Sequence, residues 1–327
     1  MNLSCTAALL VATAFTVCRA GDTPPPTEAE LRSAITKSLG YLSKGNDTWM
    51  EEKNCNGCHH LPQVLWNYRE ARMRGFAIDE KKFDEWLKWS DEKGKDIKAG
   101  REMTAFMKLA LPDNPAPELT KIIKEGQLPD GSWKAAGQFL GQRRAAPEVT
   151  SNSSRIFLLA LAASDSDKQA SEEVMTKAAA LLAKDGKATS VETLAYRTLF
   201  ARRFGKPEEV AAISAEVIAL QHTDGGWGWQ IKEPASDSIA TGLALYALQP
   251  SADPAIARAQ HWLIKNQKED GGWPVDYSKI SSTDRSKPEK AKSLKDATMI
   301  YSYWGTAWST LGLLQGVPVK QTQAAIP

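Results

Sequence analysis

The sequence predicts an all-α protein in which outer and inner helices alternate around a double ring. Three observations lead to this fold class. A short Gln-x-x-Asp-Gly motif ending in tryptophan recurs along the chain, and tryptophan is frequent, with eleven Trp against eight Phe. The helix predicted before the motif is amphipathic, whereas the helix after it is apolar almost all round. A helix without a polar face must be buried, so the apolar helices are expected inside the ring.

Residues 1–20 are predicted to be an export signal, and residues 21–327 a single helical domain. The apolar run from Ala7 to Val17 is too short to span a bilayer, and small residues follow it near Ala20. No later segment has the ~20 unbroken apolar residues of a membrane helix. The formal net charge of +2 gives no reason to expect nucleic acid as a partner. We therefore expect a periplasmic or otherwise exported protein with no membrane span.

The recurring motif sets the period of the helical units. Trp227 and Trp273 lie 46 residues apart, and Trp133 lies 94 residues before Trp227, so one unit has a length near 45 residues. In each copy the Asp-Gly pair provides a turn after the outer helix. The three clear copies are QLPDGSW at 127–133, QHTDGGW at 221–227 and QKEDGGW at 267–273.

Weaker copies complete the series to six units. They are marked by Tyr41-Leu42 with Trp49, by Trp86-Leu87, and by Leu181-Leu182 with Asp185-Gly186. Residues 254–267 are typical of the amphipathic outer helices, and residues 237–250 and 297–314 of the apolar inner helices.

The Q-x-x-D-G-G/S-W motif after an amphipathic helix resembles the QW repeat of the squalene-hopene cyclase and prenyltransferase group. The resemblance spans about residues 28–314 and implies an (α/α)6 toroid. It says little about activity, because one fold hosts many chemistries. We expect Gln127, Gln221, Gln267 and their tryptophans to tie turns to neighbouring helices.

The chain departs from the catalytic patterns of that group. The nearest string to the D-x-D-D cluster of the cyclases is Asp165-Ser166-Asp167-Lys168, which ends in lysine and suits a helix cap. The zinc-dependent prenyltransferases use a cysteine from the later repeats, and no cysteine follows Cys58. We therefore expect a protein that is not an active terpene cyclase.

Cys55, Cys58 and His59 have the C-x-x-C-H spacing that attaches haem c through two thioethers, with the histidine as an axial iron ligand. Export leads to the compartment where haem is attached, and signal cleavage leaves these two cysteines alone in the domain. A disulfide here would close only a short loop and stabilise little. Zinc is a second alternative, but adjacent His59 and His60 suit one tetrahedron poorly. We predict one covalent haem c near residues 55–59.

The register of the repeats places this site. His59 follows Trp49 by ten residues, as Asp237 follows Trp227, so His59 is expected at the start of the first inner helix, with Pro62 in its first turn. The haem is then expected at the mouth of the central cavity. Bacterial QW-repeat proteins with C-x-x-C-H after the first repeat tryptophan are similar, and that resemblance implies a toroidal monohaem cytochrome c.

The sixth iron ligand decides between electron transfer and small-ligand chemistry. Met103 and Met299 are expected in the opening turns of the second and sixth inner helices, at the same end as His59, and are candidate distal ligands. Tyr301 and Tyr303 are further candidates. An open iron position is the alternative.

Charged and polar neighbours of the site have two interpretations each. Basic residues that are candidate partners for the haem propionates, or else solvated surface, are Arg69, Arg72, Arg74 and Arg143-Arg144. His60 is expected to make a polar contact or a hydrogen bond to a haem propionate. The segment 276–295 is predicted to be a loop, and from Ser278 to Lys295 it carries six Lys or Arg against two acids. It is a candidate docking surface for an acidic redox partner.

These features predict an exported monohaem c-type cytochrome that exchanges electrons with a partner protein. One alternative is a haem enzyme, such as an oxidoreductase or peroxidase, or a sensor, with an open iron position facing a cavity that admits a small apolar ligand. A second alternative is a non-haem toroidal binding protein with a short disulfide.

Overall fold

The computed structural model describes residues 24–53, 59–94, 102–112, 117–134, 146–163, 172–275 and 288–320. Regular structure in these ranges is α-helical, with two isolated β-bridges. The predicted all-α class is confirmed. In chain order the helices are α1 (Glu28–Lys53), α2 (Leu61–Met73), α3 (Glu80–Gly94), α4 (Glu102–Ala110), α5 (Pro117–Glu125), α7 (Ala146–Leu161), α9 (Glu172–Leu182), α10 (Val191–Phe204), α11 (Pro207–Ala219), α12 (Ser238–Leu248), α13 (Pro254–Asn266) and α14 (Pro288–Leu314).

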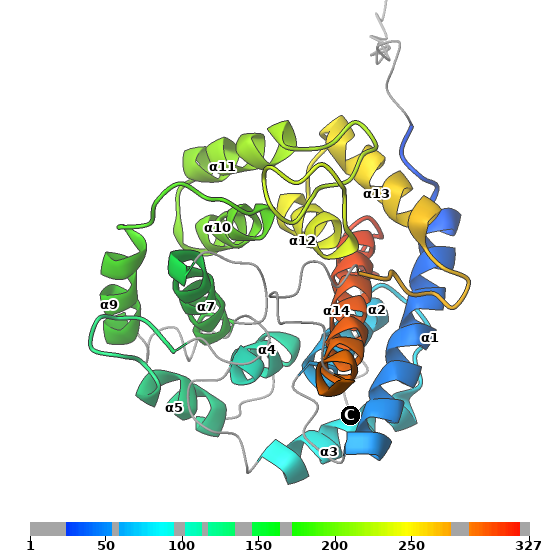
Figure 1. The fold of residues 1–327 in the computed structure, drawn as a ribbon, viewed down its shortest axis with the longest axis horizontal. Helices are drawn as coiled ribbons and strands as arrows, with labels where there is room; N and C mark the ends of the chain where they lie inside the picture. The colour runs from blue at the N-terminus through cyan, green and yellow to red at the C-terminus, as the bar shows by residue number, and fades with distance from the viewer. Residues whose placement is uncertain are drawn as a thin grey trace, which may run out of the picture.

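The helices form two concentric rings, which Figure 1 shows in cross-section. The outer ring holds α1, α3, α5, α9, α11 and α13, and the inner ring holds α2, α4, α7, α10, α12 and α14. Each inner helix contacts the next along the chain, and α14 contacts α2, so the inner ring closes. This arrangement agrees with an α/α toroid and with the predicted alternation of amphipathic and apolar helices.

Burial differs between the rings as the hydrophobic pattern requires. Every residue of inner helix α12 except Tyr246 is buried, whereas outer helix α13 buries one face. Within the described ranges, no helix combines the length and the apolar character needed to cross a membrane.

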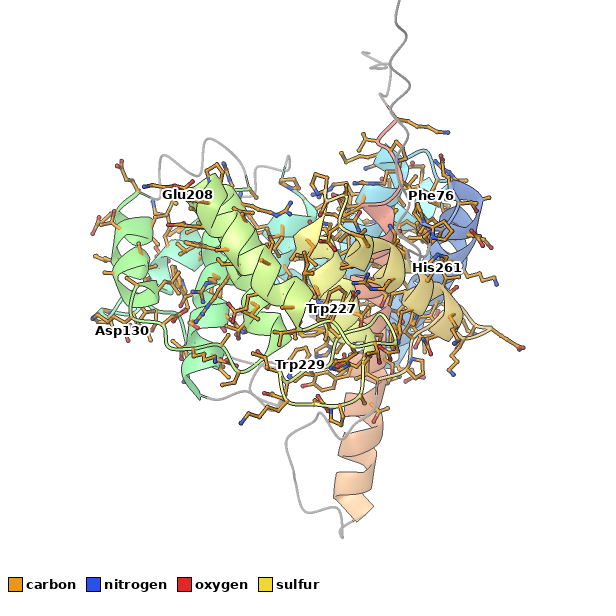
Figure 2. All side chains as sticks on the ribbon, turned by 90° about the horizontal axis from the view of Figure 1, so that it is seen from above. Phe76, Asp130, Glu208, Trp227, Trp229 and His261 are labelled. Atoms are coloured by element: carbon orange, nitrogen blue, oxygen red, sulfur yellow. The ribbon has the colours of Figure 1, made fainter. Side chains whose placement is uncertain are left out.

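One predicted boundary is wrong. The segment 276–295 was predicted to be a loop, but α14 begins at Pro288. The run PEKAKSLKD at its start places proline at the first helical position and is rich in Lys, Glu and Ala, all compatible with a helix. Figure 2 shows the start of α14 projecting from one face of the ring, beyond the other helices.

The repeated turns share one geometry. Gly225 has a φ of +94°, a conformation in which side chains with a Cβ are strained, and Gly131 and Gly271 both have +89°. Before Gly225, Asp224 Oδ1 accepts a hydrogen bond of 3.0 Å from the N–H of Gly226. The Asp-Gly pair thus sets the turn, as the sequence predicts.

Glutamine and tryptophan of the motif attach this turn to its surroundings. Gln221 Nε2 donates to the carbonyl of Gly225 at 2.9 Å and to that of Ala255 in α13 at 2.8 Å. Trp227 Nε1 donates to the carbonyl of Val217 at 2.7 Å. Equivalent bonds hold the turns after α5 and α13. The motif therefore has the structural role expected for it.

The last copy of the motif also closes the outer ring. Gln267, after α13, donates through Nε2 to the carbonyl of Ala34 in α1 at 2.9 Å. This bond joins helices that are 233 residues apart in the chain.

The inner helices run parallel, so their like ends meet. At the N-terminal end of α4, Glu102 accepts a hydrogen bond of 3.0 Å from Ser153 Oγ in the middle of α7. At the C-terminal ends, Arg69 of α2 donates to the carbonyls of Leu109 and Ala110 of α4 at 2.9 and 2.7 Å. Arginine suits this position because helix C-termini carry unpaired carbonyls and partial negative charge.

We expect Gln267→Ala to lower the free energy of unfolding by about 1–3 kcal/mol, because it leaves two buried carbonyls without their donor. Urea unfolding followed by circular dichroism measures the change. Glu269→Ala, an exposed change in the same turn, serves as the control and should stay within about 0.5 kcal/mol of the parent chain. Equal stability of the two variants would contradict a role for Gln267 in ring closure.

Gly242 in α12 allows α14 to approach closely, since a Cβ there would overlap the backbone of Trp308 and Ser309. We expect Gly242→Ala to destabilise the protein by about 1–3 kcal/mol through overpacking. The matched change Gly40→Ala, in the exposed face of α1 with nothing within 4 Å of the added Cβ, should instead stabilise it by about 0.5–1 kcal/mol. Thermal unfolding of both variants checks the opposite signs.

Candidate functional site

The first inner helix begins directly after the His59-His60 pair. His60 is the N-cap residue of α2, and Pro62 lies in the first turn, where its missing N–H costs no helical bond. This is the helix start that the repeat register predicts. Cys55 and Cys58 lie outside the described residues, so the structure leaves the predicted attachment site itself untested.

Aromatic side chains from two other helices surround the histidine pair. The His60 ring stacks on Trp49 of α1, with centroids 4.6 Å apart, and its other neighbour is Tyr303 of α14, at 3.9 Å. The His59 ring meets Trp49 edge to face at 5.0 Å. Trp304 Nε1 donates a 2.9 Å hydrogen bond to the carbonyl of His59. Helices α1 and α14 therefore both hold the segment at the start of α2.

His60 packs mainly against aromatic rings, and its expected hydrogen bond to a haem propionate stays a prediction. His60 is 1% exposed, and its Nδ1 makes no hydrogen bond to the described part of the chain. Its ring lies between two aromatic rings, which are favourable neighbours for a neutral imidazole. Helical spacing predicts that the His60 side chain points away from that of His59. It does not predict that the His60 ring contacts Trp49 and Tyr303.

Burial keeps both imidazoles neutral. It lowers the pKa of His59 to about 4 and holds the pKa of His60 well below its ordinary value. The His59 Nδ1 is buried and has no hydrogen-bond partner in the described ranges. A neutral imidazole is the form that binds a metal. His59 in this setting therefore fits the role of an axial haem ligand.

For a metal held by protein side chains alone, the described ranges offer no group of three or more His, Cys, Asp or Glu. A zinc site at residues 55–60 would need Cys55 and Cys58, which are outside those ranges.

The two candidate distal methionines lie on helices next to the histidine pair. Met299 of α14 is four residues before Tyr303 and 37% exposed, so by helical spacing it shares the helix face from which Tyr303 contacts His60. Because α14 begins at Pro288, the expectation that Met299 lies in an opening turn is wrong.

Met103 is in the first turn of α4, as predicted. It precedes Phe106 by three residues, and the Phe106 ring lies 6.1 Å from that of Trp304. The backbone of this turn is thus close to the helix that contacts His59, while the Met103 side chain is outside the described residues.

The tyrosine candidates have other roles. Tyr303 donates its hydroxyl hydrogen to the carbonyl of Leu42 at 2.9 Å, so this oxygen is engaged with α1 and the prediction of Tyr303 as a distal ligand is wrong. Tyr301 is 1% exposed and packs beside Trp304, with centroids 6.3 Å apart. Both are core residues of the wall behind the site.

The arginines of α2 pair with acidic side chains in this structure. Arg69 and Arg74 each bind Glu70 at 2.6 Å, and Arg72 pairs with exposed Glu80 at 3.1 Å. They lie near the C-terminal end of α2, and Arg74 is about 20 Å along the helix from its N-cap at 1.5 Å per residue. The length of α2 therefore separates Arg74 from His59. A helix that starts near His59 and includes Arg72 already predicts this separation. Arg143-Arg144 and Asp165–Lys168 lie outside the described residues.

Sequence reasoning missed two features of the site region. Trp304 looks like core filler in an apolar helix, and the signal that it holds His59 is only that a buried indole N–H needs an acceptor. Glu70 could have been found, because an acid between Arg69 and Arg74 on a helix that is buried nearly all round must be paired.

The fold resembles that of a solved glycosidase. A glycosidase with one glutamate changed to alanine superposes on this chain with a TM-score of 0.52 and 11% identity, covering 87% of this chain and 98% of its own. A glycosidase variant in complex with glucose gives a TM-score of 0.43 and 12% identity, covering 91% and 93%. No protein-family model and no curated protein matches the chain. At this identity, the likeness to the first glycosidase shows an all-α toroidal fold alone.

The ion pairs of Glu70 with Arg69 and Arg74 make the stability of the fold depend on pH. Burial raises the pKa of Glu70, but the hydrogen bonds and charges of Arg69 and Arg74 outweigh this, so its pKa lies below the ordinary 4.5. Stabilisation by Glu70 is therefore present above pH 4.5 and lost as the pH falls below it.

We expect Glu70→Gln to cost about 3 kcal/mol at pH 7, because it leaves buried arginine charge unpaired, and to flatten the loss of stability below pH 4.5. Urea unfolding between pH 3 and 7 measures both effects. Glu85→Gln, which removes an exposed acid 3.8 Å from Lys81, is the control and should change stability by less than about 0.5 kcal/mol. A parallel acid profile for Glu70→Gln and the parent would contradict this role.

Proposed function

We propose that this chain is an exported monohaem c-type cytochrome built on an (α/α)6 toroid of the QW-repeat type, and that it transfers electrons. The observation that carries the proposal is a half-buried His59 at the start of an inner helix, held through its carbonyl by Trp304 and directly after the C-x-x-C spacing. Cys55 and Cys58 would hold the haem through thioethers, and His59 would be its axial ligand. The bound haem would supply one-electron redox chemistry.

The surrounding residues have definable roles in such a site. Trp304 fixes the backbone of His59 through its indole N–H. Trp49 and Tyr303 pack on the adjacent His60 and exclude water from the base of the site. Burial and hydrogen bonding around a haem are the means by which a protein adjusts its reduction potential.

Met299 is the distal ligand that we favour. It shares a helix face with Tyr303, which contacts His60, and it is partly exposed rather than packed in the core. The start of α14, with its basic sequence, projects from the ring close to this region and is a reasonable docking element for an acidic redox partner.

Glycoside hydrolysis is less well supported. It uses a pair of carboxylates on either side of the bond that is cut. The central cavity of this chain, described below, is lined by no Asp or Glu within the described ranges. Terpene cyclisation lacks its acidic cluster in the sequence, as noted above.

Haem attachment is tested by expressing the full chain with bacterial haem-attachment machinery and measuring the pyridine haemochrome spectrum. We expect one haem per chain in the parent and none covalently bound in the Cys55→Ala, Cys58→Ala double variant. His59→Ala should lose the native axial ligation, whereas His261→Ala, on outer helix α13, should keep it. A haemochrome yield of zero for the parent would reject the proposal.

The same protein distinguishes electron transfer from small-ligand chemistry. A six-coordinate haem should give a low-spin spectrum and no carbon monoxide adduct in the reduced form. Met299→Ala should open the site to carbon monoxide, and Met103→Ala should leave it closed. A high-spin ferric spectrum in the parent, with carbon monoxide binding, would favour the haem enzyme or sensor instead.

A further inference from the structure

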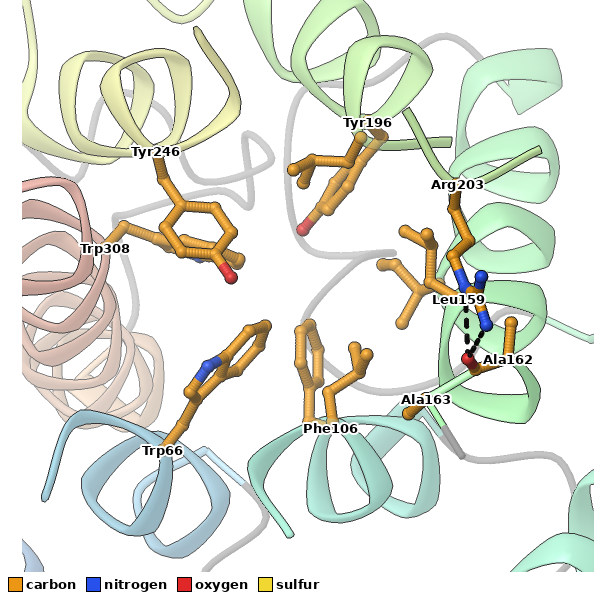
Figure 3. A pocket seen from close by; sticks show the side chains of 12 residues that line it. Trp66, Phe106, Leu159, Ala162, Ala163, Tyr196, Arg203, Tyr246 and Trp308 are labelled. Carbon is orange, nitrogen blue, oxygen red and sulfur yellow. Dashed lines mark hydrogen bonds between the residues drawn. The ribbon is translucent and has the colours of Figure 1, made fainter. Parts of the chain in front are cut away.

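A cavity of about 300 Å³ lies at the centre of the inner ring, shown from close by in Figure 3. All six inner helices contribute to its lining. One lining residue from each, in chain order of the helices, is Trp66, Phe106, Leu159, Tyr196, Tyr246 and Trp308.

This cavity is at a different level of the ring from the histidine pair. Its lining comes from the middle and C-terminal parts of the inner helices, ending with Arg203 near the end of α10. Trp66 is six residues after His60, about 9 Å along α2. The cavity is thus a separate feature from the site proposed for haem.

The walls are aromatic on more than one side. Trp66, Tyr246 and Trp308 form a cluster with centroid separations of 5.7–5.8 Å, and Tyr196 lies 6.4 Å from Trp308. In Figure 3, Trp66 and Phe106 reach toward the space from the lower helices, and Tyr246 and Tyr196 from the upper ones. Aromatic faces and edges arranged in this way suit a flat ring.

The size of the space sets the number of rings. An apolar cavity of about 150 Å³ takes a benzene molecule. Twice that volume leaves room for a ligand of one or two fused rings, at the small end of ligand pockets in general.

Polar groups on the cavity wall indicate that the ligand also carries hydrogen-bonding atoms. Figure 3 shows the hydroxyls of Tyr246 and Tyr196 directed toward the space between the helices. Burial raises the pKa of Tyr246, so this phenol stays protonated and available to donate. Trp66 is 5% exposed, and its Nε1 has no hydrogen-bond partner in the described chain. The Trp66 Nε1 group in particular calls for an acceptor, because a buried unpaired donor costs about 1–3 kcal/mol.

In the part of the chain that the structure describes, the cavity wall has no free charged group that would bind a charged ligand. The lining contains no Asp or Glu among the described residues, so it offers no carboxylate to pair with a cation. Its one cationic side chain, Arg203, donates through Nε and Nη2 to the carbonyl of Ala162, which holds its guanidinium against the wall. The ligand is therefore expected to be neutral.

From these contacts, we infer that the cavity binds a neutral, planar one- or two-ring molecule with carbonyl oxygens, a compound of the quinone type. The rings lie among the aromatic walls, and a carbonyl oxygen accepts from Tyr246. This site does not depend on haem attachment.

Binding is tested by calorimetry on the full chain with 2,3-dimethyl-1,4-naphthoquinone, whose methyl groups block addition to thiols. 2,3-Dimethylnaphthalene, with the same rings and no carbonyls, is the second probe. We expect micromolar binding of the quinone. Tyr246→Phe should weaken it about tenfold, the equivalent of one hydrogen bond, and leave the hydrocarbon affinity unchanged. Tyr41→Phe, on outer helix α1, is the matched control and should change neither affinity.

Filling the cavity locates the ligand. Leu159→Trp should abolish binding of both probes, and Ala163→Leu, a smaller change at the lining, replaces it if circular dichroism shows that the tryptophan variant is unfolded. The inference is overturned if the quinone does not bind at about 1 mM, if a folded filled variant still binds it, or if Tyr246→Phe leaves its affinity unchanged. The Cys55→Ala, Cys58→Ala variant should bind the quinone normally, so failure of haem attachment and failure of this site are separate results.

Discussion

Enclosure of the inner helices, which bury side chains on nearly every side, is the constraint on which the rest of this structure depends. Such helices are stable only if every side is covered, which requires a closed inner ring and a complete outer ring around it. The glutamine side chains of the repeated turns set the spacing of neighbouring outer helices through carbonyl groups. Gln267 makes the last of these bonds to α1, where the two ends of the domain meet.

Parallel inner helices give the ring two chemically different ends. At the C-terminal end, arginines such as Arg69 and Arg203 bind the free carbonyls of adjacent helices. The N-terminal end carries the histidine pair, and α14 extends beyond the ring on one face. Long basic side chains thus pair with the free carbonyls at the C-terminal end of the ring. The N-terminal end of the ring carries His59 and His60.

Some features of the structure follow from residues that are close together in the sequence, whereas others do not. The turn geometry at Asp224 and Gly225 depends on two adjacent residues, and it was predictable. The start of α2 after His60 was predictable for the same reason, since a proline in the first turn acts locally. The roles proposed for Arg74 and Tyr303 were wrong because each side chain finds a partner, Glu70 or Leu42, that the periodicity of the helices does not specify.

The sequence by itself determined the all-α class, the alternation of buried and surface helices, the repeated turns and the position of His59 at the beginning of an inner helix. These follow from hydrophobic period and from residues a few positions apart. Only the tertiary structure decided that Trp304 holds His59 from the opposite end of the chain, that His60 stacks on Trp49 and also contacts Tyr303, and that a cavity remains beside Tyr246. The physical reason is that these features arise from packing between helices, and packing depends on side-chain volume and direction across the ring rather than on order along the chain.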